Sequence, residues 1–188
     1  MSRDARSVAV GVGTAATVAT FVGVVTAAML APWFSWRANA LSDLGVTAGS
    51  AALFNGALLV GGVASLPYAW ALWDAADGAD RAVPVGFAAT ALLLAGVGAF
   101  PADTALHAPV AIGAFLGITA TLAVDGALRR DTPTGRVSAA LAVVHLGYWL
   151  LWGAGVRLGP GLAIPELVGS VALLVWVVTL SPVAPLDG

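Results

Sequence analysis

Long apolar runs separated by short polar stretches dominate the chain. Six runs are long enough for a helix to cross the hydrocarbon core of a bilayer, which takes about 20 residues. They cover residues 7–30, 50–73, 83–100, 105–128, 137–156 and 164–180. Such lengths exclude barrel strands, which alternate in polarity over about 10 residues, and a helix satisfies its backbone hydrogen bonds within one segment. The pattern predicts an all-α bundle of six transmembrane helices, forming a single domain over residues 1–188.

The composition agrees with a multi-pass protein of the cell membrane. Hydrophobic residues make up 60% of the 188 residues, charged residues 10%, and the mean hydropathy is +0.94. Soluble domains carry about a quarter charged residues. The net charge of −2 leaves no basic patch, so nucleic acid is not an expected partner. The lack of cysteine excludes disulfides, thiol nucleophiles and thiolate metal sites.

The first run, residues 7–30, follows Arg3 and Arg6 and superficially resembles a signal peptide. It is longer than the roughly 7–15 residues of a signal-peptide core, and no clean cleavage site precedes a soluble domain. We therefore expect a retained first span.

The arginines set the predicted orientation. Six of the eight lie in the N-terminus and in the second and fourth loops, against only Arg37 and Arg157 on the other side. The positive-inside rule then places both termini in the cytoplasm. We call the cytoplasmic side inner and the opposite side outer.

Polar residues gather on the predicted outer side. The longest polar interruption covers residues 33–45, with the sequence WFSWRANALSDLG. Each outer loop also carries one acid: Asp43, Asp103 and Glu166. We expect the outer half of the bundle to enclose a polar pocket beneath an aromatic rim. Its candidate ligand-binding residues are Asn39, Ser42, Asp43, Asn55, Asp103, His107, His145, Trp149 and Trp152.

Two outer turns are expected to meet, because short hairpins make successive helices neighbours. These are the turn at Ser42–Asp43 and the turn at Pro101–His107. In that arrangement Asp43 or Asn39 lies within side-chain reach of Asp103 or His107.

Several candidates have an architectural alternative. Asp103 precedes a helix, where it is able to act as an N-cap, and it lies four residues before His107, at the spacing of a helical pair. Ser42 and Asp43 suit a cap of a short helix, and Asn55 suits a hydrogen bond between helices. Glu166 follows a proline, which is typical of the first turn of a helix, so we leave it out of the predicted site.

His145 lies within the fifth predicted span, where an ionisable group indicates function by default. It shares one helical face with Trp149 and Trp152. A neutral histidine bonded to a neighbouring helix is the alternative. Zinc bound by His107, His145 and Asp103 suits ligand chemistry, but at ~1.5 Å per residue the two histidines differ in depth by roughly 10 Å. That gap also argues against a bis-histidine haem, and no sequence motif identifies a cofactor.

The tyrosines and tryptophans lie largely near the ends of the predicted spans, which is typical of aromatic belts at the membrane interface. Small residues within the spans, among them the GxxxG pair of Gly113 and Gly117, indicate close helix packing. This pair alone does not imply a dimer. The expected partners are membrane lipids, and association with a membrane protein or a second copy of the chain stays open.

The order of three short motifs resembles a known family. Leu41-Ser-Asp-Leu-Gly45 stands in the first outer loop, Phe100-Pro-Ala-Asp103 in the second, and His107 follows shortly after. Over nearly the whole chain this pattern resembles the archaeal and bacterial membrane family catalogued as domain of unknown function 998. The resemblance implies a six-helix membrane fold and no activity. A more distant similarity, to eukaryotic six-helix proteins implicated in lipid remodelling, is one of fold and does not carry function.

Three functions compete. In the first, the outer pocket binds a lipid headgroup or small polar ligand without chemistry. In the second, a membrane-embedded hydrolase or transferase acts on a lipid, with Asp43 or Asp103 as base, His107 as its partner and a metal as an option. In the third, the chain is a small transporter subunit, although only His145 lies deep in a span. For a functional carboxylate, Asp43→Asn would abolish function without unfolding, whereas a capping carboxylate tolerates it.

The predicted topology is testable with single cysteines, because the chain has none of its own. An impermeant thiol reagent added to intact cells should label cysteines at Ala38 and Ala102, and should label one beside Arg129 only after lysis. Labelling beside Arg129 in intact cells, with Ala38 protected, would contradict the orientation or the number of spans.

Overall fold

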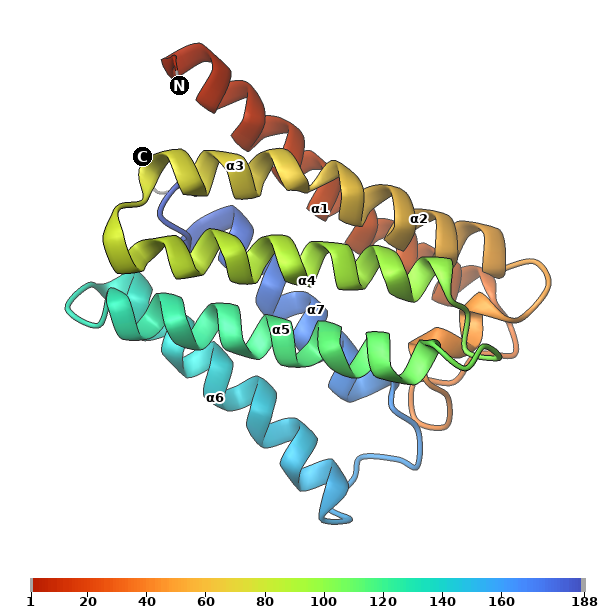
Figure 1. Ribbon diagram of the computed structural model, residues 1–188. Coiled ribbons are helices and arrows are strands. Elements are labelled where there is room, and N and C mark those ends of the chain that lie inside the picture. The colour runs from red at the N-terminus through yellow and green to blue at the C-terminus, as the bar shows by residue number, and fades with distance from the viewer. Residues whose placement is uncertain (1, 187–188) are drawn as a thin grey trace.

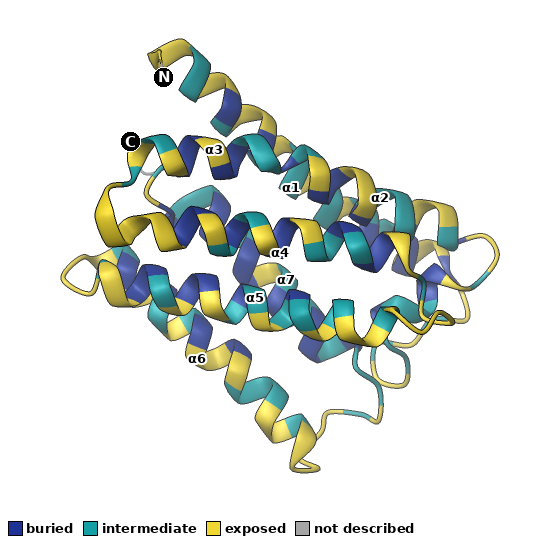
Figure 2. Ribbon diagram, viewed as in Figure 1, coloured by how far each residue is buried: buried dark blue, intermediate teal, exposed yellow. Residues whose placement is uncertain are grey.

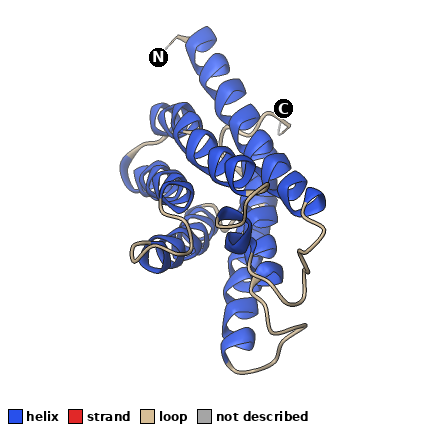
Figure 3. Cartoon of the chain, turned by 90° about the vertical axis from the view of Figure 1, so that its right-hand side faces the viewer, coloured by secondary structure: helices blue, strands red, loops and turns tan. Residues whose placement is uncertain are grey.

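The computed structural model describes residues 2–186, and within that range the protein is an all-helical bundle without strands (Figures 1 and 3). Residues 1, 187 and 188 of the predicted domain lie outside the described residues. The expected fold class, a helical membrane bundle, is confirmed. The α-helices are α1 (Arg3–Leu30), α2 (Ala51–Ala64), α3 (Leu66–Ala75), α4 (Ala82–Ala99), α5 (His107–Leu128), α6 (Pro133–Gly153) and α7 (Ala163–Val175). Shorter segments are the 3₁₀-helices η1 (Leu41–Gly45) and η2 (Gly78–Arg81) and a single turn of π-helix, η3 (Trp176–Leu180), which we call the π-turn.

Five segments of the described chain combine the length and the apolar composition of a membrane span. The second predicted span is built from α2 and α3, which meet at Ser65, and the last from α7 and η3. The five segments are Arg3–Leu30, Ala51–Ala75, Gly78–Ala99, His107–Leu128 and Ala163–Leu180.

The helix α6 is long enough to span a membrane but less apolar than the others, because it carries an arginine, a histidine and three aromatic residues with polar atoms. Its buried residues form one narrow stripe (Figure 2). Its exposed positions are nevertheless apolar: Val143, Val144, Leu150 and Leu151 are all more than half exposed. Such a surface suits contact with lipid. The count of six spans stays a prediction that the cysteine labelling tests.

The helices run alternately between two ends of the bundle (Figure 1). The N-terminus, the α3–α4 turn and the α5–α6 turn lie at one end, which is the inner end in the predicted topology. The α1–α2, α4–α5 and α6–α7 loops lie at the other end. The three loops expected on the outer side are therefore together.

Small residues bring the helices close, as the sequence predicts. A Cβ added to Gly62 would lie 2.5 Å from the Ala91 carbonyl oxygen, so α2 and α4 pack backbone against backbone. Gly117 packs against Thr90 of α4 within the same chain, where an added Cβ would lie 2.6 Å from the threonine hydroxyl. Part of the GxxxG motif thus serves packing inside the chain.

Helices α5 and α6 meet at the inner end and diverge toward the outer end (Figure 1). The contact depends on Gly126, where an added Cβ would lie 2.6 Å from the backbone nitrogen of Ala139. Gly135 packs in the same way against the carbonyl of Arg129. Without side chains at these positions the two helices touch, and their separation grows with distance from this contact.

A buried ion pair fixes this inner contact. The Asp125 side chain is fully buried and accepts hydrogen bonds from Arg129 Nε at 2.7 Å, Arg129 Nη2 at 2.5 Å and Trp176 Nε1 at 2.8 Å. Arg129 also donates to the Leu180 carbonyl at 2.5 Å and to the Thr134 hydroxyl at 3.0 Å. The interpretation of Arg129 as a topology signal alone is thus incomplete, because its guanidinium joins α5, α6 and η3.

One aromatic residue departs from the predicted belt. Tyr68 is fully buried instead of lying at the membrane interface. Its hydroxyl donates to the Val177 carbonyl at 2.6 Å and lies 2.5 Å from the Ser181 hydroxyl. A buried tyrosine hydroxyl needs such partners, and here they connect α3 to the π-turn.

We expect Asp125→Ala to destabilise the protein by about 3–5 kcal/mol, because it leaves the Arg129 charge partly buried without its partner. Unfolding in detergent micelles measures the loss. The control is Asp131→Ala, which removes an exposed pair with Arg130 at 4.0 Å and should cost less than about 1 kcal/mol. Equal losses for Asp125→Ala and Asp131→Ala would contradict the role of the buried pair.

Candidate functional site

A cavity of about 410 Å³ lies in the outer half of the bundle, where α5 and α6 diverge. We call it the outer cavity. Its apolar wall includes Ile112, Leu116 and Leu146, which are 60%, 57% and 40% exposed. These exposed residues lie along the sides of α5 and α6, so the cavity opens sideways, toward the surface that faces lipid in the predicted topology. Its polar and aromatic lining residues are Ser42, His107, Phe115, Thr119, Trp149 and Glu166.

Among the described residues, Glu166 alone brings a carboxyl group to the lining of the outer cavity. It lies in the first turn of α7 and is buried, with Oε2 accepting a hydrogen bond from the Leu41 backbone N–H at 2.5 Å. This bond fastens η1 across the start of α7. The residue also borders a void of about 40 Å³ behind the cavity, together with Ser42 and His107.

Sequence reasoning left Glu166 out of the site, because an acid after a proline suits the first turn of a helix. The structure agrees that it lies in the first turn of α7 but buries the side chain. A signal was present: Glu166 falls inside the predicted span 164–180, where ionisable groups are rare and functional.

His107 begins α5 and is held in a defined tautomer. Its Nδ1 lies 2.8 Å from the Phe100 carbonyl oxygen, which only accepts hydrogen bonds, so Nδ1 carries a hydrogen. In the neutral ring Nε2 is then an acceptor. His107 lines the outer cavity with Ser42, so the two expected outer turns meet there.

Neither Asp43 nor Asp103 lines the outer cavity, as far as the described residues show. Asp43 Oδ2 accepts from the Asn39 side chain and from the Ala40 backbone N–H, both at 3.0 Å. This is the capping arrangement of a short helix. Asp103 is exposed, and α5 starts after Leu106 with no side-chain cap, so the expected N-cap role of Asp103 is wrong. Within the described residues, His107 bonds to Phe100 in place of the expected partner Asp103.

Two further candidates hold the outer loops. The Asn55 amide donates to the Gly45 carbonyl at 2.8 Å, which ties α2 to η1. The Trp152 indole donates to the Gly161 carbonyl at 3.0 Å, and the Arg157 guanidinium lies 4.2 Å from its ring centroid. Trp152 borders a different hollow, of about 200 Å³, between α6 and the α6–α7 loop.

His145 is fully buried and both ring nitrogens have partners. The Trp149 indole, which can only donate, lies 3.0 Å from Nε2, so Nε2 is an acceptor and Nδ1 bears the hydrogen. Nδ1 donates to the Thr119 hydroxyl at 3.0 Å, which in turn donates to the Phe115 carbonyl at 3.2 Å. His145 is therefore the neutral histidine bonded to a neighbouring helix that the sequence left as the alternative. Its bond to the indole positions Trp149 in the cavity wall.

The weak metal candidates do not come together. Among the described residues, no group of three or more histidine, cysteine, aspartate and glutamate side chains has the geometry to hold a metal ion. The bonds to Thr119 and Trp149 already occupy both nitrogens of His145.

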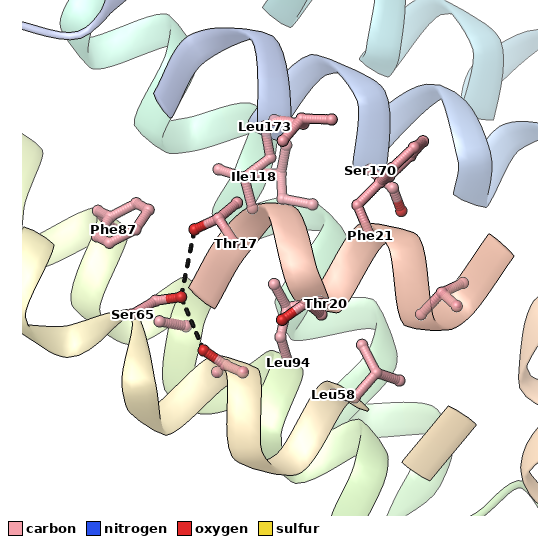
Figure 4. A pocket seen from close by; sticks show the side chains of 15 residues that line it. Thr17, Thr20, Phe21, Leu58, Ser65, Phe87, Leu94, Ile118, Ser170 and Leu173 are labelled. Carbon is pink, nitrogen blue, oxygen red and sulfur yellow. Dashed lines mark hydrogen bonds between the residues drawn. The ribbon is translucent and has the colours of Figure 1, made fainter. Parts of the chain in front are cut away.

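A smaller void of about 60 Å³ lies in the core between α1, α2, α4, α5 and α7 (Figure 4). The hydroxyls of Thr17 and Ser65 point toward each other across it, 3.3 Å apart, and Ser65 donates to the Gly61 carbonyl at 2.7 Å. The remaining lining is mainly apolar. Since these hydroxyls have partners within the bundle, we interpret the void as imperfect packing.

Comparison with family models matches residues 14–182 to a family described as "Protein of unknown function (DUF998)". Comparisons with curated proteins and with solved structures gave no match.

The bonds of Asp43 indicate a capping role, whereas a functional role would require its charge; substitutions separate the two. Asp43→Ala should destabilise the protein by about 0.5–2 kcal/mol, whereas Asp43→Asn should melt like the wild type, because an amide oxygen accepts the same two hydrogen bonds. Thermal unfolding in detergent measures both. A stable Asp43→Asn variant that loses ligand occupancy would show instead that the charge acts at the site.

Proposed function

Because the chain belongs to the family described as "Protein of unknown function (DUF998)", whose description supplies no activity, we propose a function from geometry. The protein is a helical membrane protein, and in this proposal it binds an amphiphile of the cell membrane in the outer cavity. The apolar chain of the ligand lies between α5 and α6. Its polar end lies against Ser42, His107 and Glu166.

The observation that carries the proposal is the combination of a sideways opening with a buried polar end. A volume of about 410 Å³ is within the range of pockets that bind small molecules. A purely apolar gap between helices would fill with any lipid chain. Here a buried carboxyl group borders the gap, and burying such a group is costly unless it gains hydrogen-bond partners. An amphiphile supplies both an apolar chain and such a partner.

The wall of the cavity is rigid where the ligand chain would enter. Trp149 is held by His145, and its ring packs on Phe115 with the centroids 5.1 Å apart. A preformed wall reduces the entropy lost on binding. The buried His145 therefore supports binding through Trp149 without touching the ligand.

A second candidate function, lipid hydrolysis or transfer, is favoured by one observation. Ser42 and His107 line the same cavity, and the Phe100 carbonyl orients His107 so that Nε2 is free to act as a base. No hydrogen bond joins Ser42 to His107 within the described residues, so binding without chemistry ranks first. Hydrolysis of a fluorogenic lipid ester that Ser42→Ala abolishes would reverse this order.

Filling the outer cavity should remove the bound amphiphile. Ala108 lines the cavity, so the ring introduced by Ala108→Phe would occupy space that the ligand needs. We expect the variant to retain severalfold less lipid than the wild type after purification and detergent exchange. Mass spectrometry of the extracted lipids, normalised to protein, measures the amount.

The matched control is Ala120→Phe, which adds the same ring to an exposed position of the same helix, away from the outer cavity. Its lipid content should equal that of the wild type. Equal lipid contents in all three proteins would contradict binding in the outer cavity.

A further inference from the structure

We infer that the polar end of the amphiphile is a hydrogen-bond donor, an alcohol or an amine, and not a phosphate. The inference rests on the proposed function, since it concerns the ligand of the outer cavity. It follows from the kinds of polar atom that the cavity offers, which are mostly acceptors.

Glu166 contributes a carboxyl group to the cavity. One of its oxygens, Oε2, accepts from the Leu41 backbone N–H. After this single bond the carboxyl group keeps free acceptor positions whether it is ionised or protonated, whereas only the protonated form has a donor. A ligand that donates a hydrogen bond therefore fits both forms, and a phosphate oxygen, which accepts, fits only the protonated one.

His107 adds a second acceptor. The Phe100 carbonyl fixes the hydrogen of the neutral ring on Nδ1, so Nε2 has a lone pair to offer. Ser42 is compatible with either role, because a hydroxyl both donates and accepts. None of the three groups requires an anionic ligand.

The cations that usually bind phosphate are directed elsewhere. The chain has no lysine, and no arginine lines the outer cavity. Of the two arginines in the outer loops, Arg37 donates through Nε to the Leu158 carbonyl, and Arg157 donates through Nε to the Trp152 carbonyl while stacking on its ring. Arginine forks are the common partners of phosphate, so their absence from the cavity disfavours a phosphate ligand.

The aromatic wall is compatible with both remaining classes. Phe115 and Trp149 contribute packed aromatic rings to the cavity wall. An ammonium group is attracted both to an aromatic face and to a carboxylate, whereas an alcohol forms only a hydrogen bond. The structure thus assigns the donor class, and an experiment separates its two members.

Three probes with the same ω-bromoundecyl chain and different ends (alcohol, amine, phosphate) test the inference. Bromine quenches a tryptophan that it touches, and Trp149 lies in the cavity wall. The chain has seven tryptophans, so we define cavity quenching as the difference in quenching between the wild type and the Trp149→Phe variant. We expect the alcohol or the amine to reach half-maximal cavity quenching at a concentration about tenfold lower than the phosphate, as one well-made hydrogen bond implies.

The variant Glu166→Gln should reduce this preference. It keeps an oxygen for the Leu41 N–H but replaces the other acceptor with an amide donor. The ratio of the affinity for the amine to the affinity for the phosphate should therefore fall about tenfold. Asp103→Asn is the control, because it makes the same acid-to-amide change at an exposed outer position. That ratio should not change.

The outcomes separate the inference from the proposed function. Equal quenching by the three probes, lost in Trp149→Phe, would overturn the inference and leave binding in the cavity intact. Preferential quenching by the phosphate would do the same. Quenching that is identical in the wild type and Trp149→Phe for every probe would contradict binding in the cavity itself. The wild-type probe series decides the matter even if Glu166→Gln does not fold.

Discussion

The buried pair of Asp125 and Arg129 is the constraint on which the arrangement of the last three helices depends. A carboxylate deep in a helical bundle is tolerated only with a cation and further donors, and here the cation comes from one turn later and a donor from Trp176. These bonds hold α5, the start of α6 and the π-turn together at the inner end. Gly126 allows the closest approach there. Since α6 is fixed at this end, its tilt away from α5 opens a space only at the other end, where the outer cavity lies (Figure 1).

The outer end is closed by loops instead of helix contacts. The carbonyls of Arg37 and Asn39 in the first outer loop accept backbone hydrogen bonds from Gly161 and Ala163, both at 2.9 Å. The Glu166–Leu41 bond adds a third link between the same segments. These three links hold η1, and with it Ser42, at the outer end of the cavity. The result is an apolar space with a polar end, which is the shape of an amphiphile.

The sequence predicts the helices well and the site only in part. Lengths and loop charges are local features, so the helices follow from the sequence, including α6, whose crossing of the membrane stays a prediction. Ser42, His107 and Trp149 were expected at the pocket and do line the cavity. Glu166 was left out because an acid after a proline suits the first turn of a helix, and Asp125 was not singled out, although both fall inside predicted spans. Only the tertiary packing shows that both side chains are buried. Conversely, Asp43 and Asp103 stand in conspicuous motifs, yet one bonds within its own turn and the other is exposed.

The central claim is that an amphiphile occupies the gap between α5 and α6 with its polar end at Glu166 and His107. An experimental density map of the protein purified from membranes tests this most directly. We expect elongated density in the outer cavity, with its polar end within about 3 Å of Glu166 or His107, as a hydrogen bond requires. A map in which α5 and α6 close on each other, with side chains filling the space, would contradict the account.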